Sequence, residues 1–289
     1  MISSHFKEHI AQELGTPILK IKAVSGGDIS KAYCVFTSTQ RFFLKVNESA
    51  NALKMFLTEK DGLEIISNTK TIKAPEVRHC GKYESVSYLL MEFIESKNPT
   101  SKEFETLGHQ LASLHAFAVG DSFGWNQDNY IGSLPQSNKN HKDWGLFYVR
   151  ERLLPQLKWA NEKRLLTSLE IPSETKLIKG CERFFPKVRP ALLHGDLWGG
   201  NYLIDSHGVP YLIDPAVYFG HHEVDLAMTQ LFGGFSSNFY AAYAEKIPAE
   251  PFQKERRDIY QLYYLLVHLN LFGSSYYRSV KGLLLRYFK

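Results

Sequence analysis

The chain has 289 residues, of which 44% are hydrophobic and 13% aromatic, so it is long enough to bury the core of one large or two moderate domains. Charged residues make up only 22%, which excludes a disordered chain. The 34 basic and 30 acidic side chains leave a net charge of +4. Because these charges are scattered along the chain, we do not expect nucleic acid as a partner.

The cysteines and the apolar segments bear on the cellular compartment. Cys34, Cys80 and Cys181 are odd in number and widely spaced, which argues against a disulfide scaffold or a zinc ribbon and favours a reducing compartment. The first 14 residues lack the apolar segment of a signal peptide. The most apolar stretch, 262–272, is too short to span a bilayer. We therefore expect a cytoplasmic protein without a membrane partner.

The first third of the chain predicts a small sheet with two helices. Ile2, Phe6, Ile10 and Leu14 recur every fourth residue, which predicts an amphipathic helix ended by Gly15. The elements expected next are strands at 18–24, 32–37 and 41–46, a helix at 51–66 and a strand at 86–94.

Helical periodicity dominates after residue 95. Two short strands at 202–204 and 211–213, joined by a turn, interrupt it, and the part from 225 to 288 is predicted to be almost wholly helical. These patterns predict an α+β fold of two lobes. Residues 1–94 form a small antiparallel-sheet lobe, and residues 95–289 form a larger, mainly helical lobe.

The segment 194–201, HGDLWGGN, carries the strongest functional signal. Asn201 follows Asp196 by five residues, and Asp214 stands at the end of the next hairpin. In kinase-like phosphotransferases the first Asp faces the acceptor hydroxyl, while the Asn and the second Asp hold Mg²⁺ at the phosphates of ATP. Hard oxygen ligands suit Mg²⁺. HGD alone also describes a polar turn, but the complete set favours catalysis.

A lysine in the small lobe is positioned to bind phosphates. Lys45 is embedded among apolar residues of the strand 41–46, from which it could reach the α- and β-phosphates. Glu59, fourteen residues later on the following helix, is a suitable ion-pair partner, with Glu48 and Glu64 as competitors. The alternatives are an edge-strand lysine and a solvated helix face.

The turn between the first two strands is a candidate phosphate cover. Gly26 and Gly27 would let backbone N–H groups approach the phosphates. Adjacent glycines are also common in ordinary hairpins, however, and Asp28 would repel a triphosphate unless it points outward.

The strand that ends the small lobe is a candidate nucleotide-binding hinge. Backbone groups of Glu92 and Ile94, with Phe93 between them, would bond the adenine edge, and Met91 would lie at the rear of the pocket. A plain buried strand is the alternative.

Several substitutions argue against a protein kinase. Gly195 occupies the place of the arginine in the HRD motif, and Trp198 occupies the place of a lysine. Only ten residues separate Asp214 from Asp225, which leaves no room for an activation loop. A small-molecule or modified-residue acceptor is therefore expected.

With these motifs the chain resembles the fructosamine kinase (ketosamine-3-kinase) family. The tryptophan after HGDL and the DPA-x-Y-x-G run distinguish this family from aminoglycoside and choline kinases. The resemblance extends over nearly the whole chain. It is carried by the segments 123–125, 128–136, 193–201, 214–228 and 260–263 and by Trp144, Phe147, Arg152 and Leu153.

The resemblance implies a bilobal protein-kinase-like fold that uses ATP and Mg²⁺. It also implies phosphorylation of the sugar 3-hydroxyl of ketosamines, the ribulosamine or fructosamine Amadori adducts of amines, a deglycation repair. The partners it implies are ketosamine small molecules or glycated protein lysines. We expect broad ketosamine specificity and a monomer or weak homodimer.

A polyol acceptor needs an aromatic platform and polar groups that bind hydroxyls. Trp198 is the candidate platform, whereas Trp125, Trp144 and Tyr218 are equally well explained as core residues. The polar substrate-binding candidates are Asp128, Asn129, Gln136, Arg152 and Glu223.

Other positions are assigned structural roles or depart from the family pattern. Asp225 is expected to anchor the backbone of the catalytic loop, and His194 to hold that loop through hydrogen bonds. His222 stands where many family members have arginine, and Asp28 where some have cysteine. His194, His221 and His222 form no metal-ligand set with a nearby cysteine, so we predict no zinc.

Two rival functions are considered. An aminoglycoside or choline kinase would share the motif, but an aminoglycoside site should be rich in carboxylates, and the substrate-side segments here are aromatic and mixed in charge. A pseudokinase would have lost one of four residues that are all present, namely Lys45, Asp196, Asn201 and Asp214.

Overall fold

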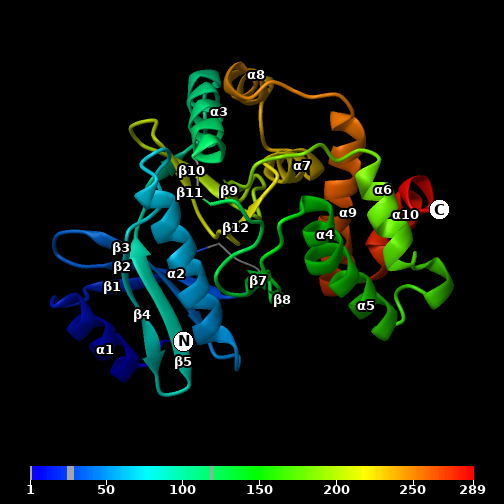
Figure 1. The fold of residues 1–289 in the computed structure, drawn as a ribbon. Coiled ribbons are helices and arrows are strands. Elements are labelled where there is room, and N and C mark those ends of the chain that lie inside the picture. Colours follow the sequence, from blue (N-terminus) through cyan, green and yellow to red (C-terminus); the bar gives the residue numbers. More distant parts are fainter. Residues whose placement is uncertain (1, 25–28, 118–119) are drawn as a thin grey trace.

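The computed structural model describes residues 2–24, 29–117 and 120–289 (Figure 1). Gly26, Gly27 and Asp28, the candidate phosphate cover, lie outside the described residues. The first part of the chain forms a five-stranded antiparallel sheet in the order β1-β2-β3-β5-β4. Its strands are β1 (Lys20–Val24), β2 (Lys31–Phe36), β3 (Arg41–Asn47), β4 (Val77–Tyr83) and β5 (Val86–Glu92).

Helices α1 (Ser4–Leu14) and α2 (Ala52–Asn68) pack on this sheet (Figure 1). The Ser3 side chain caps α1, and Gly15 ends it at φ 63°, the left-handed conformation that glycine adopts without strain. The helix predicted to end at Gly15 is therefore confirmed.

Alternation along the strands assigns one face of the sheet to each helix. Leu44 and Leu90 are paired neighbours that share a buried cluster with α1. Leu89 and Met91 belong to the cluster that contains the apolar side of α2. Lys45 is paired with Leu89, so its side chain lies on the α2 side. This strand parity directs one lysine toward the second part of the molecule.

The second part is mainly helical, as predicted. Its long central helix, α9, is lined by α5, α7 and α10 (Figure 1). It contributes Tyr260, Tyr263 and Tyr264, three of the five buried tyrosines in the core cluster around it. The helices are α3 (Ser101–Ala116), α4 (Trp144–Phe147), α5 (Leu154–Glu162), α6 (Glu174–Glu182), α7 (Glu223–Leu231), α8 (Ser237–Lys246), α9 (Gln253–Phe272) and α10 (Tyr277–Tyr287), with a π-helical turn at Tyr148–Leu153 and 3-10 turns at Ser168–Glu170 and Ser274–Tyr276.

Short strands support the loops of this part. They form three small sheets, β11-β10-β6, β12-β9 and β7-β8. The strands are β6 (Ser96–Lys97), β7 (Asn129–Ile131), β8 (Leu134–Gln136), β9 (Ala191–Leu193), β10 (Tyr202–Asp205), β11 (Pro210–Leu212) and β12 (Tyr218–Gly220). The β10–β11 hairpin matches its prediction, whereas β6, β7, β8, β9 and β12 are too short to show a period of two in the sequence.

The connection between the two parts is brief. β6 follows β5 after three residues and already pairs with β10 of the helical part. We therefore propose the boundary between the lobes at residue 94. Although α9 has 20 residues, no helix in the described part of the chain is both long and apolar enough to cross a membrane.

Candidate active site

Lys45 and Glu59 form the ion pair that the sequence predicts. The Lys45 Nζ donates to Oε1 of Glu59 over 2.7 Å and also to Oδ1 of Asp214. Burial alone would lower the pKa of Lys45, but the two carboxylates outweigh it and raise that pKa. The competitor Glu64 instead pairs with the partly exposed Lys60 at 3.0 Å. A fixed ammonium group therefore stands between the sheet and the second Asp of the motif.

Close packing of α2 on the Asp214 segment brings these groups together. A Cβ added to Gly62 would lie 2.9 Å from Cγ of Pro215, so only glycine allows this approach. Because Gly62 lies about one turn after Glu59, the same contact sets Glu59 beside Asp214. Burial raises the pKa of Glu59 to about 7. The charge of Lys45 lowers this pKa, whereas the neighbouring charge of Asp214 raises it.

Asp196 and Asn201 face each other across the catalytic loop, which we define as residues 194–201. The Asn201 Nδ2 donates to the backbone carbonyl of Asp196 at 2.8 Å and to its Oδ2 at 3.3 Å. Burial raises the pKa of Asp196 to about 7, and the charges of Asp214 and Asp225 add to this effect. A carboxyl group so tuned is suited to proton transfer near neutral pH.

Asp225 anchors the catalytic loop, as predicted. Its fully buried carboxylate accepts the N–H of His194 at 2.7 Å and that of Gly195 at 2.9 Å. The Nε2 of His115 lies 3.1 Å from the same group, and the Tyr264 hydroxyl donates to the Gly195 carbonyl at 2.9 Å. Burial would raise the pKa of Asp225, but these bonds lower it. The loop is thus held from α3, α7 and α9 together.

His194 holds the loop in the way expected from sequence. It accepts the N–H of Asp196 at Nδ1 over 3.2 Å and donates from Nε2 to the carbonyl of Ile213 over 2.8 Å. Both ring nitrogens are therefore used by the neutral form, and burial lowers the pKa of this histidine. The ring ties the Asp196 loop to the strand that leads into Asp214.

Gly195 has a conformational reason to be glycine. Its φ is 84°, and a Cβ there would lie 2.1 Å from the carbonyl oxygen of Ala216. An arginine, which protein kinases carry at this position, has no space here. The backbone of the loop instead packs directly on the Asp214–Ala216 segment.

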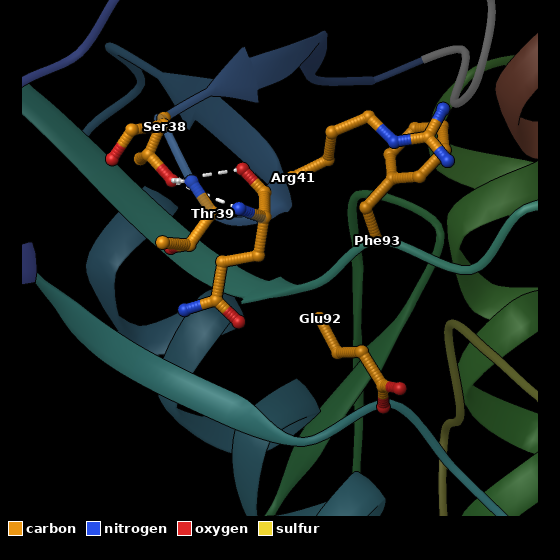
Figure 2. A pocket seen from close by; sticks show the side chains of 7 residues that line it. Ser38, Thr39, Arg41, Glu92 and Phe93 are labelled. Atoms are coloured by element: carbon orange, nitrogen blue, oxygen red, sulfur yellow. Dashed lines mark hydrogen bonds between the residues drawn. The ribbon is translucent and has the colours of Figure 1, made fainter.

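Beside the proposed hinge lies a pocket of about 500 Å³, which Figure 2 shows. Arg41 stacks over the Phe93 ring at 4.9 Å and pairs with Glu95 at 2.7 Å. The N–H of Glu92 donates to the carbonyl of Glu76, and Met91 is buried on the α2 side of the sheet and does not line this pocket. The pocket residues are Thr37, Ser38, Thr39, Gln40, Arg41, Glu92 and Phe93, none of which belongs to the catalytic motif.

Asn129, Gln136 and Arg152, three of the polar substrate candidates, form one buried network. Asn129 donates to the carbonyl of Val217 at 2.8 Å, and Gln136 donates to Asn129 at 2.8 Å. The Arg152 guanidinium stacks over the Tyr218 ring at 3.9 Å. These contacts support the strand that follows Asp214, and the structure directs the three side chains into the protein.

The remaining two candidates also have partners within the protein. Asp128 accepts the backbone N–H of Asn138 at 2.8 Å, and Glu223 forms a buried two-point pair with Arg256 at 2.6 and 2.7 Å. By contrast Trp198, two residues after Asp196, is 41% exposed and available to a ligand. The structure thus brings together Lys45, Glu59, Asp196, Asn201 and Asp214, and of the substrate candidates it leaves Trp198 and Asp128 exposed.

His221, His222 and Glu223 place one ligand atom each within 4.8 Å of one another. Each of them is already bonded to protein: His221 to Tyr260 at 2.7 Å, His222 to Tyr243 at 3.0 Å, and Glu223 to Arg256. This grouping extends the support of the catalytic loop.

The sequence gives no sign of the roles of His115, Tyr243 and Tyr264, because their partners lie far away along the chain.

An antiparallel sheet carrying a Lys–Glu pair, set against a helical part carrying Asp196, Asn201 and Asp214, defines a kinase-like phosphotransferase. The chain belongs to the fructosamine kinase family, whose model matches residues 2–289. The predicted family and the predicted bilobal kinase-like fold are confirmed, and the protein is a kinase that uses ATP.

The relatives and solved structures agree on this assignment. The chain is 37% identical over 281 residues to a protein assigned as a ketoamine kinase of Synechocystis sp., covering 96% of this chain and 94% of the relative. It is 39% identical over 273 residues to the chloroplastic protein-ribulosamine 3-kinase of Arabidopsis thaliana, covering 93% and 82%. A crystal structure assigned as a fructosamine-3-kinase from Haemophilus somnus matches with a TM-score of 0.87, 27% identity and coverage of 98% and 96%.

A more distant structure shares the fold alone. An aminoglycoside phosphotransferase in a ternary complex with ADP and hygromycin B matches with a TM-score of 0.65 at 15% identity, covering 98% of each chain. The fold therefore does not separate these two classes of kinase, and the acceptor must be argued from the site.

Proposed function

We propose that this chain is an ATP-dependent kinase that phosphorylates the sugar 3-hydroxyl of ketosamines. The observation that carries the proposal is the convergence of Lys45, Asp196, Asn201 and Asp214 in a chain of the fructosamine kinase family. The substrate class is supported by relatives that are named for ketoamines and ribulosamines. The 3-phosphorylated adduct would then decay and release the free amine, which makes the reaction a deglycation repair.

Asp196 is the proposed catalytic base. As the 3-hydroxyl oxygen attacks the γ-phosphorus, the bond to the β–γ bridging oxygen breaks, ADP leaves, and Asp196 accepts the hydroxyl proton. Burial already favours the protonated state of this carboxyl group, with a pKa of about 7. Its hydrogen bond from Asn201 fixes the carboxylate for in-line attack.

Lys45 and the hinge are the proposed ATP-binding groups. The Lys45 ammonium, held by Glu59, would bond the α- and β-phosphates. Because the N–H of Glu92 is engaged by Glu76, adenine would meet the carbonyl of Glu92 and the N–H of Ile94. Met91 would line the rear of the adenine pocket and Phe93 its outer side. Gly26 and Gly27 stay proposed as the phosphate cover.

Asn201 and Asp214 fit a Mg²⁺ site. The Asn201 Nδ2 donates to Asp196, so its Oδ1 has no protein donor among the described residues and is free for a metal. Asp214 offers the oxygen that Lys45 does not engage. Both are hard oxygen ligands of the kind that Mg²⁺ prefers. Bound there, Mg²⁺ would neutralise charge on the phosphates of ATP.

Trp198 is the proposed sugar platform, because its indole is exposed and it stands two residues after the proposed base. We propose that Asn129, Gln136, Arg152 and Glu223 act on the substrate only through the segments they hold, since each is buried and bonded within the protein. The exposed Asp128 stays proposed as a substrate contact. We further propose a monomer or weak homodimer acting on free or protein-bound adducts. Three free cysteines fit a reducing, cytoplasmic setting.

The position of the product phosphate tests this function. Incubation of ribulosyl-lysine with Mg·ATP should give a product whose phosphorus couples to C3 of the sugar in nuclear magnetic resonance spectra. An analogue lacking the 3-hydroxyl should not be turned over. Phosphate on another carbon, or equal turnover of the 3-deoxy analogue, would contradict the proposed regiochemistry. The Asp196→Ala variant is the blank.

A further inference from the structure

Four aromatic side chains, Phe232, His268, Phe272 and Tyr276, gather beside the catalytic loop, and we call them the aromatic cluster. His268 lies at its centre, with ring centroids 4.7 Å from Phe232, 5.4 Å from Phe272 and 5.2 Å from Tyr276. Phe232 is 45% exposed and Phe272 is 55% exposed. Exposed rings that lie together form a contiguous apolar surface, which is a feature of binding sites.

Two contacts fix the aromatic cluster next to the catalytic loop. Phe232 ends α7 and leads into Gly233 and Gly234, which meet Gly199: a Cβ on Gly199 would lie 3.3 Å from the Gly233 carbonyl oxygen and from the Gly234 Cα. Gly199 immediately follows the exposed Trp198. On the other side His268 lies one turn after Tyr264, whose hydroxyl bonds the Gly195 carbonyl.

A third contact places the end of α9 at the junction of the two lobes. A Cβ at Gly132, in the β7–β8 turn, would lie 3.0 Å from Leu271 and 3.4 Å from Ile29. Ile29 precedes β2, so the sheet-bearing lobe reaches this turn as well. The end of α9, which carries Phe272, therefore lies beside the segment of the small lobe that leads into β2.

The hydrogen bond of His268 defines which chemistry the aromatic cluster offers. Its Nδ1 lies 2.8 Å from the carbonyl oxygen of Tyr264, which only accepts, so Nδ1 carries the proton. Burial lowers the pKa of His268 and favours the neutral ring. The lone pair of Nε2 then has no protein donor among the described residues. A hydrogen-bond acceptor amid aromatic faces suits an ammonium group.

We propose that the aromatic cluster is the subsite for the amine half of the substrate; this inference rests on the proposed ketosamine kinase function. Phe232, Phe272 and Nε2 of His268 would hold the secondary ammonium group and its aliphatic stem. A ketosamine is distinguished from a plain ketose by this cation. Cation–π contacts and an acceptor lone pair select it without a carboxylate. Sugar recognition at Trp198 and amine recognition at the aromatic cluster would then be separate.

The test compares a charged substrate with its neutral counterpart. Ribulosyl-lysine carries a secondary ammonium group, whereas its N-acetyl derivative at the same nitrogen does not. The wild-type protein should prefer the charged substrate. Phe232→Ala and Phe272→Ala should each raise its KM by about twofold to thirtyfold, the range of one cation–π contact, and reduce that preference. The KM for ATP should stay unchanged.

Two further variants keep the test specific. His268→Asn retains a donor toward the Tyr264 carbonyl but removes the Nε2 acceptor, so it should reduce the preference for the charged substrate as well. Phe117→Ala removes a similarly exposed phenylalanine at the end of α3 and should change neither KM. Thermal melting confirms that each variant is folded.

The outcomes separate this inference from the function on which it rests. If the wild-type protein phosphorylates neither substrate, the proposed function fails. If it phosphorylates ribulosyl-lysine and all three cluster variants keep its KM and its preference for the charged form, the amine subsite is wrong while the kinase function stands.

Discussion

Asp214 serves two neighbours at once, and its backbone reflects this. It bonds Lys45, and its charge raises the pKa of Asp196. Its φ of 55° lies in the left-handed region, which costs free energy for any residue other than glycine and which aspartate tolerates better than most. Its carboxylate accepts a bond from Lys45, which belongs to the other lobe. A residue held in this way is a mark of a functional position.

Replacement of Lys45 tests the central cation. Lys45→Met removes the ammonium group and leaves Glu59 and Asp214 facing each other. We expect kcat to fall about 10²- to 10³-fold, as when one preorganised donor is removed from an active site. Lys60→Met, which breaks the surface pairs with Glu64 and Asp61, is the matched control in a kinetic assay. Equal effects of the two variants would contradict the assigned role of Lys45.

Gly195 allows a sharp conformational test. Gly195→Ala places a Cβ 2.1 Å from a carbonyl oxygen at a positive φ, so the catalytic loop must shift. We expect loss of nearly all activity and a melting temperature several degrees lower, since unfavourable backbone conformations cost about 1–3 kcal/mol each. Gly282→Ala in α10, where no atom lies within 4 Å, should leave activity intact. A fully active Gly195→Ala protein would refute the loop geometry.

The sequence predicts the catalytic residues of the site better than it predicts the residues that hold them in place. The spacing of Asp196, Asn201 and Asp214 and that of Lys45 and Glu59 indicate the catalytic group, because each set lies on adjacent local elements. The polar substrate candidates differ. Whether Arg152 meets a ligand or stacks on a buried tyrosine depends on packing across distant segments, which no local pattern encodes.

At the scale of elements, three helices hold one loop. α7 supplies Asp225, α3 supplies His115 and α9 supplies Tyr264. Each helix buries the polar group it contributes, so the loop is fixed from within the core rather than from the surface. The catalytic loop is therefore expected to be preorganised before any ligand binds.

Asp225→Asn tests this support. The amide would point an N–H group toward one of two backbone donors, which should cost about 1–3 kcal/mol of folding free energy. We expect kcat to fall at least tenfold, with the KM for ATP little changed, because Lys45 and the hinge are untouched. Asp121→Asn, in an exposed pair with Lys142, is the control. Denaturant unfolding and steady-state kinetics would show the difference, and an unaltered kcat would speak against the anchor.

Some elements could be predicted and others could not. Helix α1 and the strands β1, β2, β3 and β5 follow from period and turn signals. The edge strand β4 was missed because its side chains are half exposed on both faces and do not alternate. The π-helical turn at Tyr148–Leu153 also has no sequence signal, although it positions Arg152 beside Tyr218.

At the scale of the whole molecule, buried histidines link stability to pH. His221 is fully buried, its Nδ1 lies 2.7 Å from the Tyr260 hydroxyl, and His222 and Arg256 are neighbouring positive or titratable groups. Burial first, and these neighbours next, hold the pKa of His221 well below its usual range. The unfolded chain binds a proton below about pH 6.5 and the folded chain does not, so stability is lost as the pH falls below that value.

His221→Asn isolates this contribution, because asparagine can keep the bond to Tyr260. Relative to the variant, the wild-type protein should lose about 1.4 kcal/mol of unfolding free energy per pH unit below 6.5. Asp196 and Glu59 act in the opposite direction, because their raised pKa values of about 7 lower the unfolding free energy as the pH rises. Both proteins contain these two residues, so the difference between their unfolding free energies cancels that effect. Parallel unfolding profiles across pH would contradict a neutral buried His221. His207→Asn, at an exposed site, is the control.

Mg·ATP consumption, measured side by side with ribulosyl-lysine, fructosyl-lysine, kanamycin and choline, tests the assignment most directly. The Asp196→Ala variant sets the blank, since it lacks the proposed base. We expect turnover only with the two ketosamines, and their ratio would define the preferred sugar. Turnover confined to kanamycin or choline, or silence with all four despite measurable ATP binding, would contradict a ketosamine kinase.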